Sequence, residues 1–123
     1  DGAKKAKYHA AASILSNQVI AVLDMGYTLL EDCGFTRAEA VRATGQLVMR
    51  NIENVLEAGC DGALTGPIER NDIETVKKHI ACMQNDDSDD VSLYKMLGTK
   101  LANIAEKKNP DKDYTQMMEL LRG

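Results

Sequence analysis

The segment DGALTGPIERNDIETVKKHI, residues 61–80, carries side chains whose types and spacing suit binding chemistry. Thr65 offers a hydroxyl group, and Arg70 offers a planar guanidinium whose parallel N–H groups match a carboxylate or a phosphate. A helix is predicted to begin directly after Arg70, and the free N–H groups of its first turn would face the same anion. These residues predict an anion-binding loop.

A purely structural interpretation of this loop stays open. Gly66 permits backbone conformations that are closed to other residues, and Pro67 stiffens the turn that follows it. The loop could then serve only to connect two helices, with the guanidinium of Arg70 bridging to the carboxylate of Asp72. The residue types alone do not decide between a connection and a binding site.

A second group of polar side chains lies near the N-terminus. His9, Ser13 and Asn17 are spaced four residues apart, so they share one side of a predicted and otherwise apolar helix. In one interpretation these side chains hydrogen-bond to a neighbouring backbone. In the other they form the polar wall of a ligand site at the N-terminal half of the helix.

No metal site is predicted. The two histidines, His9 and His79, lack further ligands at the spacing of a zinc site. His79 lies between apolar positions of a predicted helix, which is typical of a residue at the boundary of a core. Asp86, Ser88 and Asp90 imitate the start of a calcium loop, but the sixth position is not Gly and the twelfth is not Glu. Acidic residues are favoured at a helix N-terminus in any case.

The sequence contains no G-x-G-x-x-G, no G-K-[ST] and no Ser/His/Asp order. The chain therefore has none of the usual devices for holding a dinucleotide. We expect no complete enzyme within it and no cofactor bound by this chain alone. Because it begins at Asp1 rather than at Met, we expect it to be a piece of a longer protein.

Length and charge exclude several classes of protein. The 123 residues fit one domain, residues 1–123, and the net charge of −4 without a Lys/Arg run argues against nucleic-acid binding. No apolar run approaches the roughly 18 residues of a membrane span, and no signal peptide is visible. We expect a cytoplasmic protein without membrane contacts. Cys33, Cys60 and Cys82 lack C-x-x-C spacing and are expected to be reduced and mostly buried.

The composition favours packed helices. Aromatic residues make up only 4% of the chain and Trp is absent, whereas sandwiches and barrels prefer aromatic and β-branched strands. We predict an all-α fold of about five helices around one long N-terminal helix. That helix runs from about residue 4 to residue 33 and ends at Gly34. The next helix opens with the capping box of Thr36 and Glu39 and stops at Gly59.

Three further helices are predicted after the loop. Asn71 and Glu74 are expected to cap the first of them, and Pro110 separates the last from its predecessor. The apolar faces expected to build the core are, in chain order after the long helix, Val41, Gly45, Val48, Ile52 and Val55; Ile73, Val76, Ile80 and Met83; Tyr94, Leu97, Leu101 and Ile104; and Tyr114, Met117 and Leu121.

The long helix is apolar on two faces. One stripe is Ala12, Leu15, Val19, Val22, Gly26, Leu29 and Cys33, and the neighbouring stripe is Ile20, Leu23, Tyr27 and Leu30. At ~1.5 Å per residue the helix spans ~40 Å, whereas a chain of this length has a radius of gyration of only ~14 Å. A helix apolar on more than one face must be enclosed, so we expect a partner domain or a second subunit to cover it.

Two segments of the chain resemble a known family. YHAAASILSN, residues 8–17, and ALTGPIERNDIETVKKHI, residues 63–80, resemble the C-terminal helical domain of a domain-of-unknown-function family of NADP-dependent oxidoreductases. That family pairs the helical domain with an N-terminal Rossmann domain. It is similar to pyrroline-5-carboxylate reductase and, more distantly, to the C-terminal domains of 6-phosphogluconate and β-hydroxyacid dehydrogenases. The resemblance covers roughly residues 5–105.

The resemblance implies a homodimer formed through the long helix, with an active cleft between the helical and Rossmann domains. NADP would be bound mainly by the Rossmann domain, which is absent from this chain. The resemblance gives a reaction class but no substrate, and the guanidinium of Arg70 leads us to expect a small anionic molecule. In the first segment the implied site residues are His9, Ser13 and Asn17. In the second segment they are Thr65, Gly66, Pro67, Arg70, Asp72, Thr75 and His79.

The implied roles follow from the side chains. His9 or Asn17 would polarise a carbonyl or an imine by proton donation or hydrogen bonding, and Arg70 would hold a carboxylate or a phosphate. Asn71 stands where the family usually has Gly in an R-G-D sequence. Asn tolerates left-handed conformations better than most residues, so we expect the turn to survive.

Two functions remain under consideration. The first is the substrate-binding and dimerisation half of a two-domain NADP-dependent oxidoreductase. The second is a non-catalytic helical module that only dimerises or scaffolds. A helical DNA-binding regulator is disfavoured by the acidic charge and by the lack of a basic recognition helix.

Overall fold

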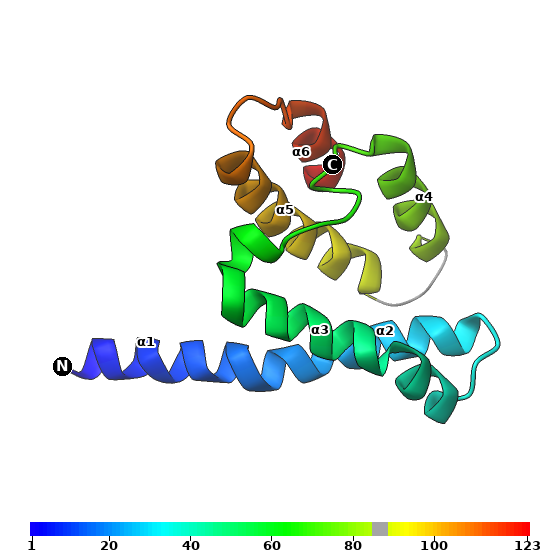
Figure 1. The fold of residues 1–123 in the computed structure, drawn as a ribbon, viewed down its shortest axis with the longest axis horizontal. Coiled ribbons are helices and arrows are strands. Elements are labelled where there is room, and N and C mark those ends of the chain that lie inside the picture. Colours follow the sequence, from blue (N-terminus) through cyan, green and yellow to red (C-terminus); the bar gives the residue numbers. More distant parts are fainter. Residues whose placement is uncertain (85–88) are drawn as a thin grey trace. The chain divides into compact units, whose positions relative to one another are not determined.

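A computed structural model describes residues 1–84 and 89–123 of the chain. Every regular element within these residues is a helix (Figure 1), which confirms the prediction of an all-α fold. The chain divides into two compact units, Asp1–Val48 and Met49–Gly123, and each is described by itself. The expectation of one domain over the whole chain stays a prediction. The calcium-like positions Asp86 and Ser88 lie outside the described residues.

The first unit is dominated by one continuous helix from Gly2 to Asp32, close to the predicted bounds. It consists of α1 (Gly2–Ser13), a π-helical turn η1 (Ile14–Gln18) and α2 (Val19–Asp32). The backbone N–H of Phe35 donates to the carbonyl of Leu30 (3.2 Å), which closes the C-terminus. Gly34 has a φ of +102°, a conformation that favours glycine, and this explains why the helix ends there.

The next helix, α3 (Arg37–Ala63), begins with the predicted capping box. The N–H of Thr36 donates to Oε1 of Glu39 (2.9 Å), and the N–H of Glu39 donates to Oγ1 of Thr36 (3.1 Å). The backbone bond from Thr36 is the main reason that the pKa of Glu39 is lowered. The helix bends at Gly59, which has a φ of +79°, and continues through one more turn instead of stopping as predicted.

The contacts between α2 and the start of α3 are mostly polar and exposed. The guanidinium of Arg37 bridges to Asp24 (3.1 Å) and to Glu31 (2.9 Å), and it lies 5.7 Å from the ring centre of Tyr27. Exposed ion pairs of this kind each contribute ~0–1 kcal/mol. Among all residues of α1, η1 and α2 none is buried, and in the first unit only Ala40 is.

By length and composition the continuous helix Gly2–Asp32 could cross a membrane, with a mean hydropathy of 1.2 over 18 residues. No unbroken apolar run predicts this stretch, because Asn17, Gln18 and Asp24 interrupt its apolar residues. The core helix of a soluble protein and a signal sequence pass the same test, so the finding is weak evidence for a membrane.

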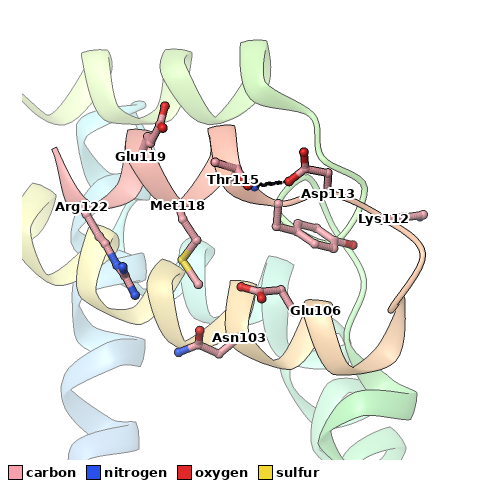
Figure 2. Close-up of a pocket in the computed structure, with 9 residues that line it drawn as sticks. Asn103, Glu106, Lys112, Asp113, Thr115, Met118, Glu119 and Arg122 are labelled. Atoms are coloured by element: carbon pink, nitrogen blue, oxygen red, sulfur yellow. Dashed lines mark hydrogen bonds between the residues drawn. The ribbon is translucent and has the colours of Figure 1, made fainter.

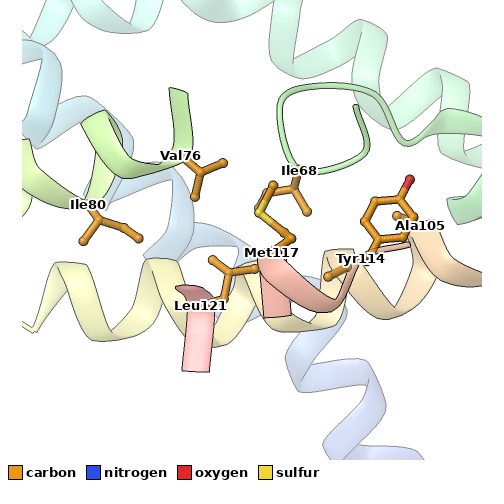
Figure 3. Close-up of a cluster of buried hydrophobic side chains, with 8 residues drawn as sticks. Ile68, Val76, Ile80, Ala105, Tyr114, Met117 and Leu121 are labelled. Carbon is orange, nitrogen blue, oxygen red and sulfur yellow. The ribbon is translucent and has the colours of Figure 1, made fainter. Parts of the chain in front are cut away.

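The second unit contains a well-packed core. Helices α4 (Ile73–Met83), α5 (Asp90–Lys108) and α6 (Thr115–Arg122) pack together with the loop that precedes α4 (Figure 3). The buried cluster consists of Ile68, Val76, Ile80, Ala102, Ala105, Tyr114, Met117 and Leu121. The predicted apolar faces of α4 and α6 are therefore confirmed, with Ile73 only half-buried.

Two predicted core faces are wrong. In α3, Val41 and Ile52 are 42% and 43% exposed, and Gly45, Val48 and Val55 of the same face are half-buried rather than buried. In α5, the buried residues are Gly98, Ala102 and Ala105 rather than the larger apolar residues predicted. A Cβ atom at Gly98 would lie 2.8 Å from Cδ2 of Leu121, so the close approach of α6 selects the small-residue face of α5.

All three cysteines are free, as predicted, but all three are exposed rather than buried. Cys33 caps the C-terminus of α2, and Cys60 follows the bend at Gly59. Cys82 lies on the outer side of α4, where its thiol donates to the carbonyl of His79 (3.0 Å). Composition alone does not reveal which positions of a helix remain exposed.

Candidate functional site

The predicted anion-binding loop is a structured turn, residues 64–72. The N–H of Asp72 donates to the carbonyl of Pro67 (2.8 Å), and the N–H of Asn71 donates to the carbonyl of Ile68 (3.1 Å). This pair of bonds is the Schellman pattern, in which one helical turn is closed by a residue in the left-handed conformation. Ile68 is buried in the core and thereby anchors the turn to the packed helices of the second unit.

Asn71 is that left-handed residue, with a φ of +59°, so the expected survival of the turn without glycine is confirmed. Its side chain contributes a second restraint, because Nδ2 donates to the carbonyl of Asp113 (3.0 Å). An asparagine here therefore provides the turn conformation and a contact that glycine lacks.

The loop is also held by the connection between α5 and α6. Oη of Tyr114, a buried residue, donates to the carbonyl of Glu69 (2.6 Å). Nδ2 of Asn109 donates to Oη of Tyr114 (3.0 Å) and to Oε1 of Glu69 (3.2 Å), and Nζ of Lys108 donates to the carbonyl of Leu64 (2.8 Å). Residues about 40 positions later in the chain thus fix the backbone of the loop.

Arg70 projects from this fixed turn into solvent. Within residues 1–84 and 89–123 no carboxylate lies within ion-pair distance of its guanidinium, so the predicted alternative of an Arg70–Asp72 bridge is not formed. The charge of Arg70 acts on Asp72 only as a minor cause of its lowered pKa. The guanidinium therefore remains available to an external anion.

Asp72 and Thr75 have a structural role. The carboxylate of Asp72 accepts from Oγ1 of Thr75 (2.7 Å) and from its N–H (3.2 Å), which makes Asp72 the N-cap of α4 in place of the predicted Asn71. These two bonds, the side-chain bond first, lower the pKa of Asp72. A carboxylate and a hydroxyl that satisfy each other have less to offer a substrate.

His79 is half-buried on α4 and pairs with a residue that sequence reasoning did not assign to the site. Its Nδ1 lies 2.9 Å from Oη of Tyr94 on α5, and the two rings meet edge to face. Burial raises the pKa of Tyr94, and nearby Cys82 raises it further. This pairing fits the interpretation of His79 as a boundary residue. The only signal for Tyr94 in the sequence is its place in the apolar spacing of α5, and that spacing predicts a packing role rather than a site residue.

The first predicted group lies on the long helix. His9 and Asn17 are exposed, and Ser13 is half-buried. Oγ of Ser13 donates to Oε1 of Gln18, five residues later (3.2 Å), across the π-helical turn η1. A π turn inserts one residue and rotates the face that follows, and such turns are frequent at functional sites. Gln18 thus joins this polar group, although the spacing of an ideal helix excludes it.

The structure keeps the two predicted groups in different units. His9, Ser13 and Asn17 belong to the first unit, and the second unit contains Thr65, Gly66, Pro67, Arg70, Asp72, Thr75 and His79. Within the second unit the loop residues and the start of α4 form one continuous surface element. We treat this turn as the anion candidate and the polar group on the long helix as a separate feature.

A wide groove of about 640 Å³ lies elsewhere in the second unit, between the end of α5 and α6. Figure 2 shows Met118 and Arg122 of α6 and Asn103 and Glu106 of α5 directed into it. Its lining is mainly exposed and carries charges of both signs. None of the site residues predicted from the sequence lines it, so we assign no function to this groove.

Comparison with known families agrees with the extent of the resemblance. The family described as Domain of unknown function (DUF2520) matches residues 1–101. The chain belongs to the DUF2520 family. No curated protein and no solved structure matches the chain.

The DUF2520 match ends within α5, and this has a structural consequence. The side chains that hold the loop from α5 onward are those of Lys108, Asn109 and Tyr114, and all three follow residue 101. The segment matched by the family therefore contains the loop and its own turn bonds, and three further side chains that restrain the loop come from the segment after the match.

The Tyr114 contact can be tested by removing its hydroxyl group. Tyr114→Phe should lower the unfolding free energy by about 1–2 kcal/mol, because the carbonyl of the half-buried Glu69 loses its donor. The amides of Arg70, Asn71 and Asp72 should exchange faster in hydrogen-exchange mass spectrometry. Tyr94→Phe is the matched control and should leave these amides unchanged. Equal exchange in wild type and Tyr114→Phe would show that the contact does not hold the loop.

The capping role of Asp72 predicts a pH dependence. Since its folded pKa is below the ordinary 3.8, its contribution to stability is complete above that value and is lost as the pH falls through the folded pKa. Asp72→Asn keeps a capping side chain but cannot titrate. In urea unfolding between pH 5 and pH 2 (roughly the window of carboxylate titration), wild type should lose more stability than this variant. Parallel curves would contradict the assignment.

Proposed function

We propose that this chain is the substrate-binding and dimerisation domain of a two-domain NADP-dependent oxidoreductase that acts on a small anionic molecule. Its helical fold would then be of the type found in the C-terminal domain of 6-phosphogluconate dehydrogenase. The observation that carries the proposal is the helix Gly2–Asp32, which buries none of its residues although apolar stripes run along it. The anion-binding turn supplies the second half of the argument.

The long helix exposes large apolar side chains of the kind that a protein–protein interface buries. Leu15, Ile20 and Tyr8 are 78%, 64% and 79% exposed. Full burial of one such aliphatic side chain stabilises by roughly 1.5–3 kcal/mol, so a helix exposing several of them gains most from a partner. A second copy of the same helix is the simplest partner, because a two-fold axis pairs a self-complementary stripe with itself.

The turn supports the anionic substrate. Arg70 is exposed, lacks a carboxylate partner in the described part of the chain, and projects from a backbone fixed by Tyr114 and Asn71. A pre-positioned guanidinium binds a carboxylate or phosphate without a further ordering cost in its backbone. Thr65, at the start of the turn, adds an exposed hydroxyl group to the same segment.

The nucleotide would be held outside this chain. The described residues contain no strand followed by a glycine-rich turn and a helix, which is the unit that cradles a dinucleotide phosphate. When bound, NADP supplies hydride chemistry. In this proposal His9 and Asn17 act on the substrate by hydrogen bonding or proton donation to its carbonyl or imine, which their exposed side chains permit.

A non-catalytic association module is the second candidate, and two observations favour it. Asp72 and Thr75 satisfy each other, and His79 is paired with Tyr94, so three of the expected substrate residues already have partners. A dimer does not separate the two candidates, because both predict one. The sequence of the gene upstream of Asp1 separates them. An in-frame strand–G-x-G-x-x-G–helix unit that begins about 120–170 residues before the codon for Asp1 would support the oxidoreductase.

Anion binding distinguishes the candidates in the isolated chain. Inorganic phosphate or a small carboxylate at 100 times its Kd should stabilise the protein by about 2.7 kcal/mol in thermal or urea unfolding. Arg70→Gln should abolish this gain. Arg50→Gln, which removes an exposed guanidinium from α3, is the control of equal charge and should keep it. No gain with any of these anions, or an equal gain in Arg70→Gln, would favour the association module.

Catalysis is tested in the intact parent enzyme. His9→Ala or Asn17→Ala should lower turnover at least about tenfold, because a general acid or hydrogen-bond donor contributes typically 10²–10⁴-fold when optimally placed. The helix content should be unchanged by circular dichroism. Lys7→Ala, on the same exposed helix, is the control and should retain wild-type turnover. Unchanged kinetics in both variants would remove the polar group from the active site.

A further inference from the structure

A pocket of about 340 Å³ lies within the second unit, between the C-terminal part of α3, the start of the loop and α5. Five of its lining residues are apolar and three are polar without charge. They are Val55, Ala63, Leu64, Leu101 and Ile104, and Asn51, Cys60 and Thr65. Of these residues only Thr65 belongs to a predicted site, because Asn51 and Cys60 belong to no motif.

The shape of this pocket depends on two backbone features. The bend at Gly59 changes the direction of α3 and carries Cys60 and the following turn to the wall of the pocket. The ammonium group of Lys108 donates to the carbonyl of Leu64 (2.8 Å), a lining residue, and fixes the start of the loop. The pocket is therefore formed by restrained backbone, as small-molecule sites usually are.

The chemistry of the lining is uncharged. No Asp, Glu, Lys, Arg or His lines this pocket. An ionised group placed in it would find no counter-charge among these residues, whereas a neutral polar group needs none. Arg70, the anchor of the proposed anion site, does not line it either. The guanidinium of Arg70 thus favours an anion, whereas the pocket beside it in the sequence favours a neutral group.

The three polar residues offer hydrogen bonds. The amide of Asn51 and the hydroxyl of Thr65 each donate and accept, and the thiol of Cys60 donates weakly. None of these three side chains hydrogen-bonds to another residue in the part of the chain that the structure describes. The arrangement of an apolar wall with a few neutral polar groups matches a ligand with an aliphatic body and one polar end.

We propose that this pocket binds a small neutral molecule with an aliphatic body and an amide or hydroxyl group, and that Asn51 and Thr65 hydrogen-bond to that group. A cavity of about 150 Å³ holds benzene, so this open pocket accommodates roughly ten non-hydrogen atoms. The site shares Thr65 with the predicted substrate set, and none of its other residues belongs to that set. Cys60 reports on its occupancy.

Cysteine alkylation provides the test. The three cysteines are free and exposed, and only Cys60 lines this pocket, so Cys33 and Cys82 are controls within the same molecule. The rate of modification by iodoacetamide is measured for each by peptide mass spectrometry, with 4-methylpentanamide as the probe. At ten times its Kd the probe should slow alkylation of Cys60 about tenfold, because only the unoccupied fraction reacts. Cys33 and Cys82 should react at unchanged rates.

A matched ligand and a matched variant complete the experiment. The carboxylate 4-methylpentanoate has the same body and should not protect Cys60. Thr65→Val preserves the shape of the side chain and should weaken protection by the amide, while helix content stays unchanged by circular dichroism. Arg70→Gln should not alter it, which separates this site from the anion site.

Four outcomes would overturn the proposal. They are no protection of Cys60 by the amide up to its solubility limit, equal protection of all three cysteines, equal protection by the carboxylate, and slower alkylation of Cys60 with rising protein concentration in the absence of the probe. The last result would show that a second copy of the chain, rather than a small molecule, covers the pocket.

Discussion

The main constraint on this structure is a long apolar helix that buries none of its residues within the described chain. The helix Gly2–Asp32 exposes Leu15 and Ile20 to water, and none of its residues is buried. The polar contacts of Arg37 that tie it to the next helix are exposed and weak. Hydrophobic burial is the main favourable contribution to folding. We propose that association with a partner supplies it for this helix.

The second unit is built in the opposite way. Its helices bury a continuous core, and the loop before α4 is part of that core through Ile68. The contact of Tyr114 with Glu69 then fixes the conformation of the loop, although the tyrosine lies outside the segment matched by the DUF2520 family. The turn carrying Arg70 and the long apolar helix thus belong to separate units of one chain. This division is compatible with the proposed combination of dimerisation and small-molecule binding.

Local rules predicted the parts of the fold that local contacts determine. The capping box of Thr36 and Glu39 forms as expected. Asn71 adopts the left-handed conformation expected of the glycine that usually stands at this position. The apolar faces of α4 and α6 also follow their helical spacing. Each of these features depends on residues within about four positions of one another.

Features that depend on distant partners escaped prediction. The face of α5 that is buried is set by Leu121 against Gly98, which helical spacing does not encode. The exposure of the three cysteines reflects which helix faces find neighbours. The π-helical turn that brings Gln18 to Ser13 breaks the ideal period on which the polar stripe was predicted. The pocket beside Thr65 requires α3 and α5 together, so no single motif announces it.

Sedimentation equilibrium of the chain, compared with Leu15→Lys, tests the central claim most directly. The account predicts a wild-type dimer that dissociates on dilution, with a weaker association constant in the variant because a charge replaces an exposed apolar contact residue. A matched change at Lys100→Ala, an exposed residue of α5, should leave the association constant unchanged. A monomer at every concentration, or identical association in wild type and Leu15→Lys, would contradict the assignment of the long helix as an interface.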